Sequence, residues 1–238
     1  MMKWLKDPTG RFPERPYYDA EELDNLSEDL IVNFLHGKYG EVSFPVSTED
    51  LTILIESETS DLDQYADLTS EGDDVEGVTF FFSDRKPIVK IAEELAATGF
   101  REHRLRTTLA HELGHVKLHT GLWQFNQLRL LPNEDENSGP RCKRGGILSV
   151  AQTDWMEWQA GYVSGAMLMP VTSLKELAHA KFTGWGTYGS VYRESSKGDE
   201  LIRLTAARFD VSRDAARVRL EQLGLLTHGT GRVSLTLE

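Results

Sequence analysis

The most informative stretch of this sequence is His111-Glu112-Leu113-Gly114-His115. Two histidines four positions apart lie on the same face of a helix, so both imidazoles can reach one cation. The glutamate between them can accept a proton from a water molecule that attacks a carbonyl carbon. The surrounding residues favour a helix with a buried apolar stripe, formed by Leu109, Leu113 and Val116. The stretch therefore predicts a helix that carries a metal site with hydrolytic chemistry.

A catalytic zinc site needs a third protein ligand and one position that stays open for water. The metzincin pattern would supply a third histidine, but it fails here, because Leu118 replaces its glycine and Gly121 replaces its histidine. His119 shares a helical face with the two motif histidines. Three successive turns span about 12 Å, which is too far for one ion to bind all three rings. We interpret His119 as a residue that supports a ligand or caps the helix, with a ligand role as the alternative.

Glu157 is the best candidate for the third ligand. It lies in the segment Asp154–Tyr162, which is otherwise mostly apolar and aromatic, and an unpaired carboxylate there would be costly to bury. A cation would remove that cost, whereas the alternative is a partly exposed glutamate on an amphipathic helix. Asp154 is the second choice, although its position favours a helix cap. The ligand set suits Zn²⁺, with Mn²⁺ as the alternative.

Two blocks of the sequence together resemble the ImmA/IrrE family of bacterial metallopeptidases. The first block is Arg106–His119, and the second is Glu157–Gly161 with the later run Met167–Pro170. Glu157 corresponds to the glutamate ligand of the family, and Gly161 stands where the family has asparagine. The resemblance covers roughly residues 75–226 and includes the helix-turn-helix-like segment that commonly follows in the family.

The resemblance implies a metal-dependent endopeptidase that cleaves a helix-turn-helix transcriptional repressor and so derepresses stress or mobile-element genes. It implies that His111, His115 and Glu157 hold the metal and that Glu112 is the catalytic base. A further donor must stabilise the oxyanion that forms during peptide cleavage. The residue types offer several candidates without choosing among them: Tyr162, Tyr188, Tyr192 and His179.

Cys142 is the only cysteine and lies in the basic run Arg141–Arg144. Basic neighbours favour the thiolate, which is a good zinc ligand, so this residue could occupy the open metal position as a latch. The alternative is an ordinary loop cysteine. A single cysteine excludes an internal disulfide and fits a reducing compartment, so we expect a cytoplasmic protein.

Charge and hydropathy limit the remaining function classes. The net charge of −12 argues against a protein that coats nucleic acid. The apolar runs are too short to span a bilayer, and the first residues lack an apolar core of signal-peptide length. The alternative function is a non-catalytic metal-binding regulator that sequesters a protein partner or binds DNA through its C-terminal module. That module holds five arginines between positions 201 and 226.

The sequence predicts an α+β fold: a mainly helical, zincin-like catalytic domain with a small antiparallel sheet, followed by a helix-turn-helix or winged-helix-like module. We expect residues 1–40 to form an N-terminal arm and helix, residues 41–180 the metallopeptidase domain, and residues 190–238 the winged-helix-like module. The module is expected to contain two helices and a strand: Leu201–Phe209, Arg213–Leu223 and Arg232–Leu237.

Local signals predict the elements before the metal motif. Residues 1–18 read as an extended arm that packs against the body. A helix should begin at a capping box of Asp19 and Glu22 and end at glycines 37 and 40, and a second helix should begin near Ser47. Two further runs should form a β-hairpin, which could offer a free edge to an extended substrate or be purely structural: Val78–Phe82 and Pro87–Ile91. After the motif, an irregular stretch (131–152) should precede a helix that stops at Pro170.

Overall fold

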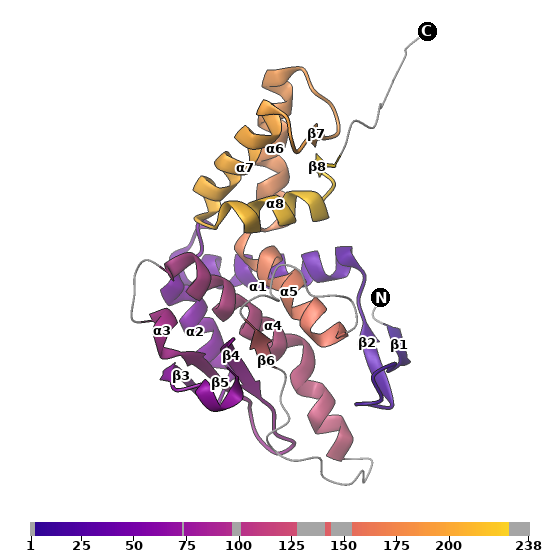
Figure 1. Cartoon of the computed structure of the whole chain (residues 1–238), viewed down its shortest axis with the longest axis vertical. Helices are drawn as coiled ribbons and strands as arrows, with labels where there is room; N and C mark the ends of the chain where they lie inside the picture. The colour runs from indigo at the N-terminus through magenta and orange to yellow at the C-terminus, as the bar shows by residue number, and fades with distance from the viewer. Residues whose placement is uncertain (1–2, 73, 97–100, 128–140, 144–153, 229–238) are drawn as a thin grey trace. The chain divides into compact units, whose positions relative to one another are not determined.

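The computed structural model in Figure 1 describes five segments of the chain: residues 3–72, 74–96, 101–127, 141–143 and 154–228. The chain divides into two compact units, the first ending at Pro170 and the second beginning at Val171. Helices and small sheets make up the described residues, which confirms the α+β class. The expected domain boundaries after residues 40 and 180 stay predictions. In the described segments, no helix combines the length and apolar character that a membrane crossing requires.

The described part of the first unit is built around one long helix, α4. This helix packs against α2, against α5 and against the main sheet. Its residues Leu109, Leu113 and Val116 are buried, as the apolar stripe predicts. A short 3₁₀ turn, η1, accompanies the α-helices of this unit: α1 Ala20–Tyr39, α2 Thr48–Glu58, η1 Thr69–Glu71, α3 Glu93–Ala96, α4 Glu102–Gln127 and α5 Trp155–Leu168.

Capping residues fix where α1 and α2 begin. Asp19 accepts a hydrogen bond from the backbone N–H of Glu22 at 2.9 Å, and the Glu22 carboxylate accepts one from Asp19 N at 3.2 Å, which confirms the predicted capping box. Ser47 caps α2, so the prediction that a second helix begins near this residue is confirmed. Gly40 ends α1 with a left-handed φ of 77°. The prediction that Gly37 helps to end the helix is wrong, because this glycine lies inside α1.

Four strands form the main sheet in the order β3-β5-β4-β6. The two predicted strands, β4 and β5, pair antiparallel, which confirms the hairpin. They occupy the inner positions, because β3 pairs parallel with β5 and β6 pairs antiparallel with β4. The suggested free edge for a substrate is therefore wrong at Val78, where β6 is paired, and along Ile88–Lys90, where β3 is paired. Along the rest of the hairpin it stays a prediction. The strand bounds are β3 Asp61–Ala66, β4 Val75–Phe80, β5 Ile88–Ala92 and β6 Arg141–Lys143.

Strand β6 lies inside the stretch 131–152, which was expected to be irregular. That expectation is wrong for Arg141–Lys143, because these residues pair with β4 through the backbone. The remainder of the stretch lies outside the described residues.

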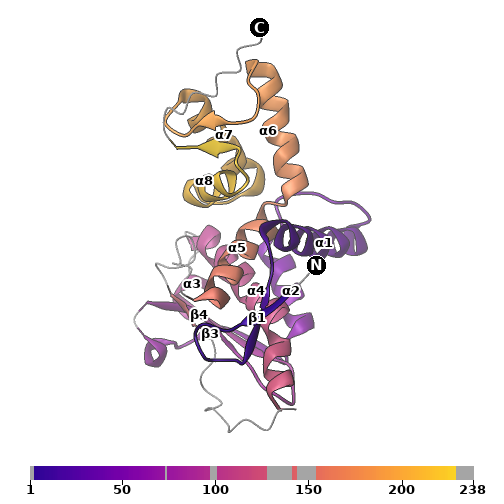
Figure 2. The same cartoon turned by 90° about the vertical axis from the view of Figure 1, so that its right-hand side faces the viewer.

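An N-terminal arm of two antiparallel strands, β1 Lys3–Lys6 and β2 Glu14–Tyr17, packs against α5 (Figure 2). In the loop between the strands, the Asp7 carboxylate accepts hydrogen bonds from Phe12 N at 2.9 Å and from Trp155 Nε1 at 3.0 Å. The Phe12 ring packs edge-on against Trp155 with its centroid 6.4 Å away. The prediction of an extended arm that packs against the body is confirmed.

Asp7 should make the arm sensitive to acid. Burial raises the pKa of Asp7, but the hydrogen bonds from Thr9, Phe12 and Trp155 outweigh burial and lower it. A carboxylate with a lowered pKa stabilises the fold above its unfolded-state pKa of about 3.9 and loses that contribution as the pH falls through the folded-state pKa. In urea unfolding, we expect Asp7→Ala to reduce the free energy of unfolding by about 2 kcal/mol at neutral pH and by less near pH 3. An equal reduction at both pH values would contradict this role of the carboxylate.

The described part of the second unit contains three helices and two short parallel strands: α6 Val171–Trp185, β7 Val191–Tyr192, α7 Ser196–Phe209, α8 Arg213–Gln222 and β8 Leu226–Thr227. The predicted pair of helices around a tight turn is confirmed, and Asp210 in the turn has a left-handed φ of 50°. The buried residues Leu201, Phe209 and Leu220 form part of its core. The strand expected at Arg232–Leu237 lies outside the described residues.

Candidate metal centre

Helices α4 and α5 bring the three predicted ligands together. His111 and His115 lie on the face of α4 that meets α5, and both side chains are fully buried. Gly114 allows the two helices to approach closely, because a Cβ atom at this position would lie only 2.5 Å from Val163 Cγ2. Glu157 comes from the first turn of α5 and points at the two imidazoles. The close helix packing is therefore what places a carboxylate on the histidine motif.

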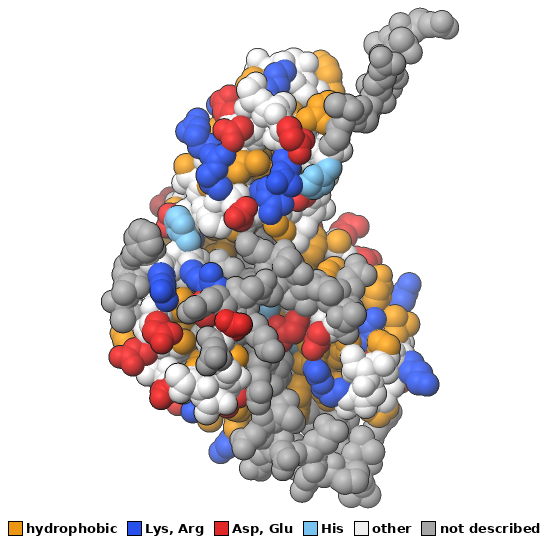
Figure 3. Space-filling view, viewed as in Figure 1, with side chains coloured by type: hydrophobic (Ala, Val, Ile, Leu, Met, Phe, Trp, Pro, Cys, Tyr) orange, Lys and Arg blue, Asp and Glu red, His pale blue; other side chains and the backbone are white. Residues whose placement is uncertain are grey.

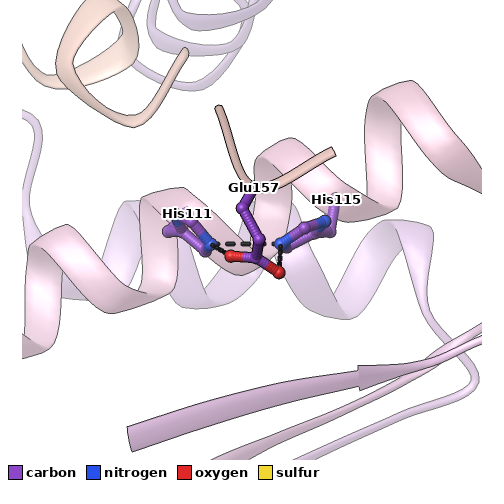
Figure 4. Close-up of side chains that lie close together, drawn as sticks. All are labelled: His111, His115 and Glu157. Atoms are coloured by element: carbon purple, nitrogen blue, oxygen red, sulfur yellow. Dashed lines mark hydrogen bonds and ion pairs between the residues drawn. The ribbon is translucent and has the colours of Figure 1, made fainter. Parts of the chain in front are cut away.

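The side chains of His111, His115 and Glu157 form a compact cluster (Figure 4). Glu157 Oε2 lies 3.2 Å from His111 Nε2, Glu157 Oε1 lies 3.4 Å from His115 Nε2, and the two Nε2 atoms are 3.0 Å apart. In a tetrahedral zinc site with bonds of about 2.1 Å, ligand atoms lie about 3.4 Å apart. The ligand types and their spacing therefore fit one zinc-like ion. Among the residues that the structure describes, no other trio of such groups has this spacing.

The charges within the cluster are complementary. Burial raises the pKa of Glu157, but the neighbouring rings of His115 and His111 outweigh burial and lower it strongly. Burial lowers the pKa of His115, but the Glu157 carboxylate outweighs burial and raises it. Glu157 is therefore a carboxylate anion in contact with two imidazoles. A positive charge in the site is needed to compensate the cost of burying this anion.

Glu112 is a second buried carboxylate beside this cluster. Its Oε2 accepts a hydrogen bond from Thr79 Oγ1 at 2.7 Å, whereas its Oε1 is buried and has no hydrogen-bond partner among the described residues. Burial raises the pKa of Glu112, and the opposing effect of His115 does not cancel the shift. Gly77 on β4 leaves room for the carboxylate, because a Cβ atom there would lie 2.6 Å from Glu112 Oε1. The result is a buried proton acceptor with one oxygen unused by the protein.

His119 lies behind His115 and outside the three-residue cluster. Its Nδ1 is 3.1 Å from His115 Nδ1, and its Nε2 is 3.0 Å from Gln159 Oε1. Burial lowers the pKa of His119 to about 3, so the ring is neutral. This geometry supports a role in holding a ligand, as the helical spacing suggests, and gives no support to direct ligation.

The remaining candidate residues lie elsewhere. Asp154 caps α5 by accepting a hydrogen bond from Met156 N at 3.1 Å, which confirms the cap, and it also pairs with Arg11 at 3.3 Å. Tyr162 is buried on α5, with its ring centroid 5.7 Å from that of Trp158. The three other candidates for an oxyanion donor belong to the second unit: His179, Tyr188 and Tyr192.

Three residues around the site were not predicted from the sequence: Gly77, Thr79 and Gln159. A glycine inside a strand often marks the close approach of another group, so Gly77 was detectable in principle. Thr79 and Gln159 carry no comparable signal. Cys142 pairs with Gly77 in the backbone register of β4 and β6, but its side chain lies outside the described residues, so the latch stays a prediction.

Comparison with known proteins adds no assignment. The chain matches no protein-family model and no curated protein. The chemistry of the site therefore follows from its own residues: two imidazoles, one carboxylate in the cluster and a second carboxylate beside it.

Proposed function

We propose that this protein is a metal-dependent endopeptidase of the zinc type, with the ion held by His111, His115 and Glu157. The observation that carries the proposal is the state of Glu112. Its carboxylate is fully buried, has a raised pKa and keeps Oε1 without a hydrogen-bond partner among the described residues. A proton acceptor of this kind is what general-base catalysis at neutral pH requires.

The composition of the cluster favours a catalytic site over a structural one. Structural zinc sites are closed by four protein ligands, whereas catalytic sites have three and leave one position open. The cluster contains three ligand side chains, and Glu112 makes its hydrogen bond to Thr79 and not to a ligand. A purely structural site would not require a second buried carboxylate, which is expensive to desolvate.

Glu112 and Thr79 have different roles in the proposed reaction. When bound, the ion would supply Lewis acidity, which polarises a peptide carbonyl and makes water more acidic. Glu112 Oε1 accepts the proton of the attacking water, while the hydrogen bond from Thr79 to Oε2 keeps the carboxylate in place. Because its pKa is raised, Glu112 holds that proton and then delivers it to the leaving amine nitrogen.

A repressor with a helix-turn-helix is the proposed substrate, and the ImmA/IrrE family is the proposed relationship. The support is the pair of motif blocks in the sequence, which correspond to α4 and α5 and meet at Gly114. The zincin-like character of the first unit and the winged-helix-like character of the second belong to the same proposal. A chain with one cysteine suits a reducing compartment, so we propose that the reaction takes place in the cytoplasm.

A cleavage assay tests this function. The protein, reconstituted with Zn²⁺ or Mn²⁺, is incubated with a purified helix-turn-helix repressor encoded beside its gene and, separately, with a proteome-derived peptide library. We expect discrete cuts that a chelator abolishes and added metal restores. If mass spectrometry finds no metal-dependent cut in the repressor or in the library, the endopeptidase proposal fails.

Replacing Gly77 by alanine should disturb Glu112 while leaving the ligands in place. The added methyl group would meet Glu112 Oε1 at 2.6 Å and Thr108 Cγ2 at 2.9 Å, so the carboxylate must move. We expect unchanged zinc content and peptide hydrolysis about 10²-fold slower, because a small misplacement of a catalytic group has an effect of this size. Gly37→Ala is the matched control, since nothing lies within 4 Å of its added Cβ. Normal hydrolysis by Gly77→Ala would contradict the role given to Glu112.

The second unit gives little support to the alternative of DNA binding. Its arginines are largely paired: Arg217 Nη1 lies 3.0 Å from Glu221 Oε2, Arg193 Nη1 lies 3.7 Å from Glu221 Oε1, and Arg213 pairs with Asp199. On the face seen in Figure 3, basic side chains of this unit alternate with acidic ones. Phosphate backbones bind to continuous positive surfaces, and this face is not one.

A further inference from the structure

Two buried polar side chains behind the metal cluster have no part in the mechanism above. His119 lies on α4 one turn after His115, Gln159 lies on α5 two residues after Glu157, and both are at most 1% exposed. Together with the backbone of Pro16 they form a continuous chain of polar contacts from the N-terminal arm to a metal ligand. The direction of each hydrogen bond in this chain follows from which atoms can donate.

The chain begins at the backbone carbonyl of Pro16 in β2. Gln159 Nε2 lies 3.1 Å from this oxygen. A carbonyl oxygen can only accept a hydrogen bond, so the NH₂ group of Gln159 must face Pro16. Exchanging the two amide atoms would place two oxygens against each other. Gln159 Oε1 therefore faces the opposite way, toward His119.

This orientation fixes the tautomer of His119. Gln159 Oε1 can only accept, so His119 Nε2, 3.0 Å away, carries the hydrogen. His119 is fully buried, and its ring nitrogens contact His115 and Gln159, neither of which is an anion, so its imidazole is neutral. A neutral imidazole has one N–H group, so His119 Nδ1 is an acceptor. It lies 3.1 Å from His115 Nδ1, and this contact is a hydrogen bond only if His115 Nδ1 donates. A neutral His115, the form that binds a cation, then has its lone pair on Nε2, the atom that faces the cluster.

We infer that His119 and Gln159 are positioning residues, which hold His115 in the tautomer that can bind the ion through Nε2. The inference rests on the proposed metal site. Ligating histidines commonly donate their second N–H group to a carboxylate or a carbonyl. A neutral imidazole takes that place here, and it suits a buried site in which Glu112 and Glu157 already balance the charge of a divalent ion. Because this series of hydrogen bonds starts at Pro16, the N-terminal arm also helps to orient His115.

Zinc affinity, measured by competition with a chromophoric chelator, tests the inference. We expect Gln159→Leu and His119→Phe to bind zinc about 10–100-fold more weakly than the wild type. His119→Gln should regain part of the affinity, because its amide can accept from His115 Nδ1 and donate to Gln159. Ser164→Ala is the matched control. Ser164 is buried on α5, and among the described residues its hydroxyl donates only to the carbonyl of Gly161, which has no part in the hydrogen bonds from Pro16 to His115. Wild-type affinity is therefore expected.

The tautomer can be read without any variant, by ¹⁵N NMR of histidine-labelled, zinc-loaded wild-type protein. We expect His119 to carry hydrogen on Nε2 and to have a bare, hydrogen-bonded Nδ1. Hydrogen on His119 Nδ1, or wild-type zinc affinity in both Gln159→Leu and His119→Phe, would overturn the inference and leave the metal site standing. A wild-type protein that binds no zinc would instead overturn the proposed function.

Discussion

Replacing Glu112 by glutamine should reduce metal-dependent peptide hydrolysis by about 10²–10⁴-fold, because the variant loses the proton acceptor of the reaction. The side chain keeps its size, and its amide oxygen can still accept the hydrogen bond from Thr79 Oγ1 that Glu112 Oε2 accepts at 2.7 Å. The zinc content should stay at one ion per chain, because Glu112 is not a member of the ligand cluster. New N-termini from a proteome-derived peptide library, counted by mass spectrometry, measure the rate.

Glu102→Gln is the control for this experiment. Glu102 lies on the same helix, is exposed, and within the described segments its carboxylate accepts a single hydrogen bond, from Thr48 Oγ1 at 3.1 Å. Its variant should cleave like the wild type. If Glu112→Gln also cleaves like the wild type, the general base is another group and the proposed mechanism is wrong. If cleavage stops only because zinc is lost, Glu112 contributes to the metal site and not to proton transfer.

Replacing Glu157 by alanine should remove the metal. Two imidazoles would remain, and zinc held in proteins generally takes at least three protein ligands. At a zinc concentration about 1,000 times its Kd, binding stabilises the wild-type fold by about 4 kcal/mol, and the variant should lose nearly all of this stabilisation. Urea unfolding with and without zinc measures the difference. A comparison of each protein with its own metal-free form separates metal loss from any direct effect of the substitution on the fold.

Asp154→Ala is the informative control, because Asp154 was the second choice for the ligand. Its carboxylate caps α5 and pairs with Arg11, so its loss should lower the stability of both forms by about 0.5–2 kcal/mol. The zinc-dependent difference should remain at its wild-type size. A loss of that difference in Asp154→Ala, together with its retention in Glu157→Ala, would show that the wrong carboxylate has been assigned to the ion.

The sequence is most informative where a signal is local. The capping residues Asp19 and Ser47, the β4–β5 hairpin and the helix pair α7 and α8 each depend on neighbouring residues, and each is present in the structure. Strand β3 was missed because its sequence, DLDQYA, is acidic and lacks a clean alternation of apolar residues. It pairs with β5, which is more than twenty residues away, and no local pattern encodes that pairing.

In the candidate site too, a local sequence pattern places some residues and tertiary contacts place the others. The two histidines and Glu112 share one helix, so their proximity could be read from a spacing of four residues. Bringing Glu157 to them requires α5 to pack on α4 at Gly114, which is a tertiary contact. The hydrogen bond from Thr79 and the contact between His119 and Gln159 likewise join separate elements. The helical or strand period of a sequence cannot predict such contacts between separate elements. These contacts nevertheless orient Glu112 and His115.

X-ray absorption spectroscopy of untagged, zinc-reconstituted wild-type protein shows whether His111, His115 and Glu157 hold one ion, with the zinc content measured by elemental analysis. We expect one zinc per chain, bound by nitrogen and oxygen atoms, and a more distant scattering signal from two imidazoles. That signal should disappear in Glu157→Ala together with the zinc. If the wild-type protein retains no stoichiometric zinc after reconstitution, or if Glu157→Ala binds zinc equally well, these three residues do not form the proposed catalytic metal site.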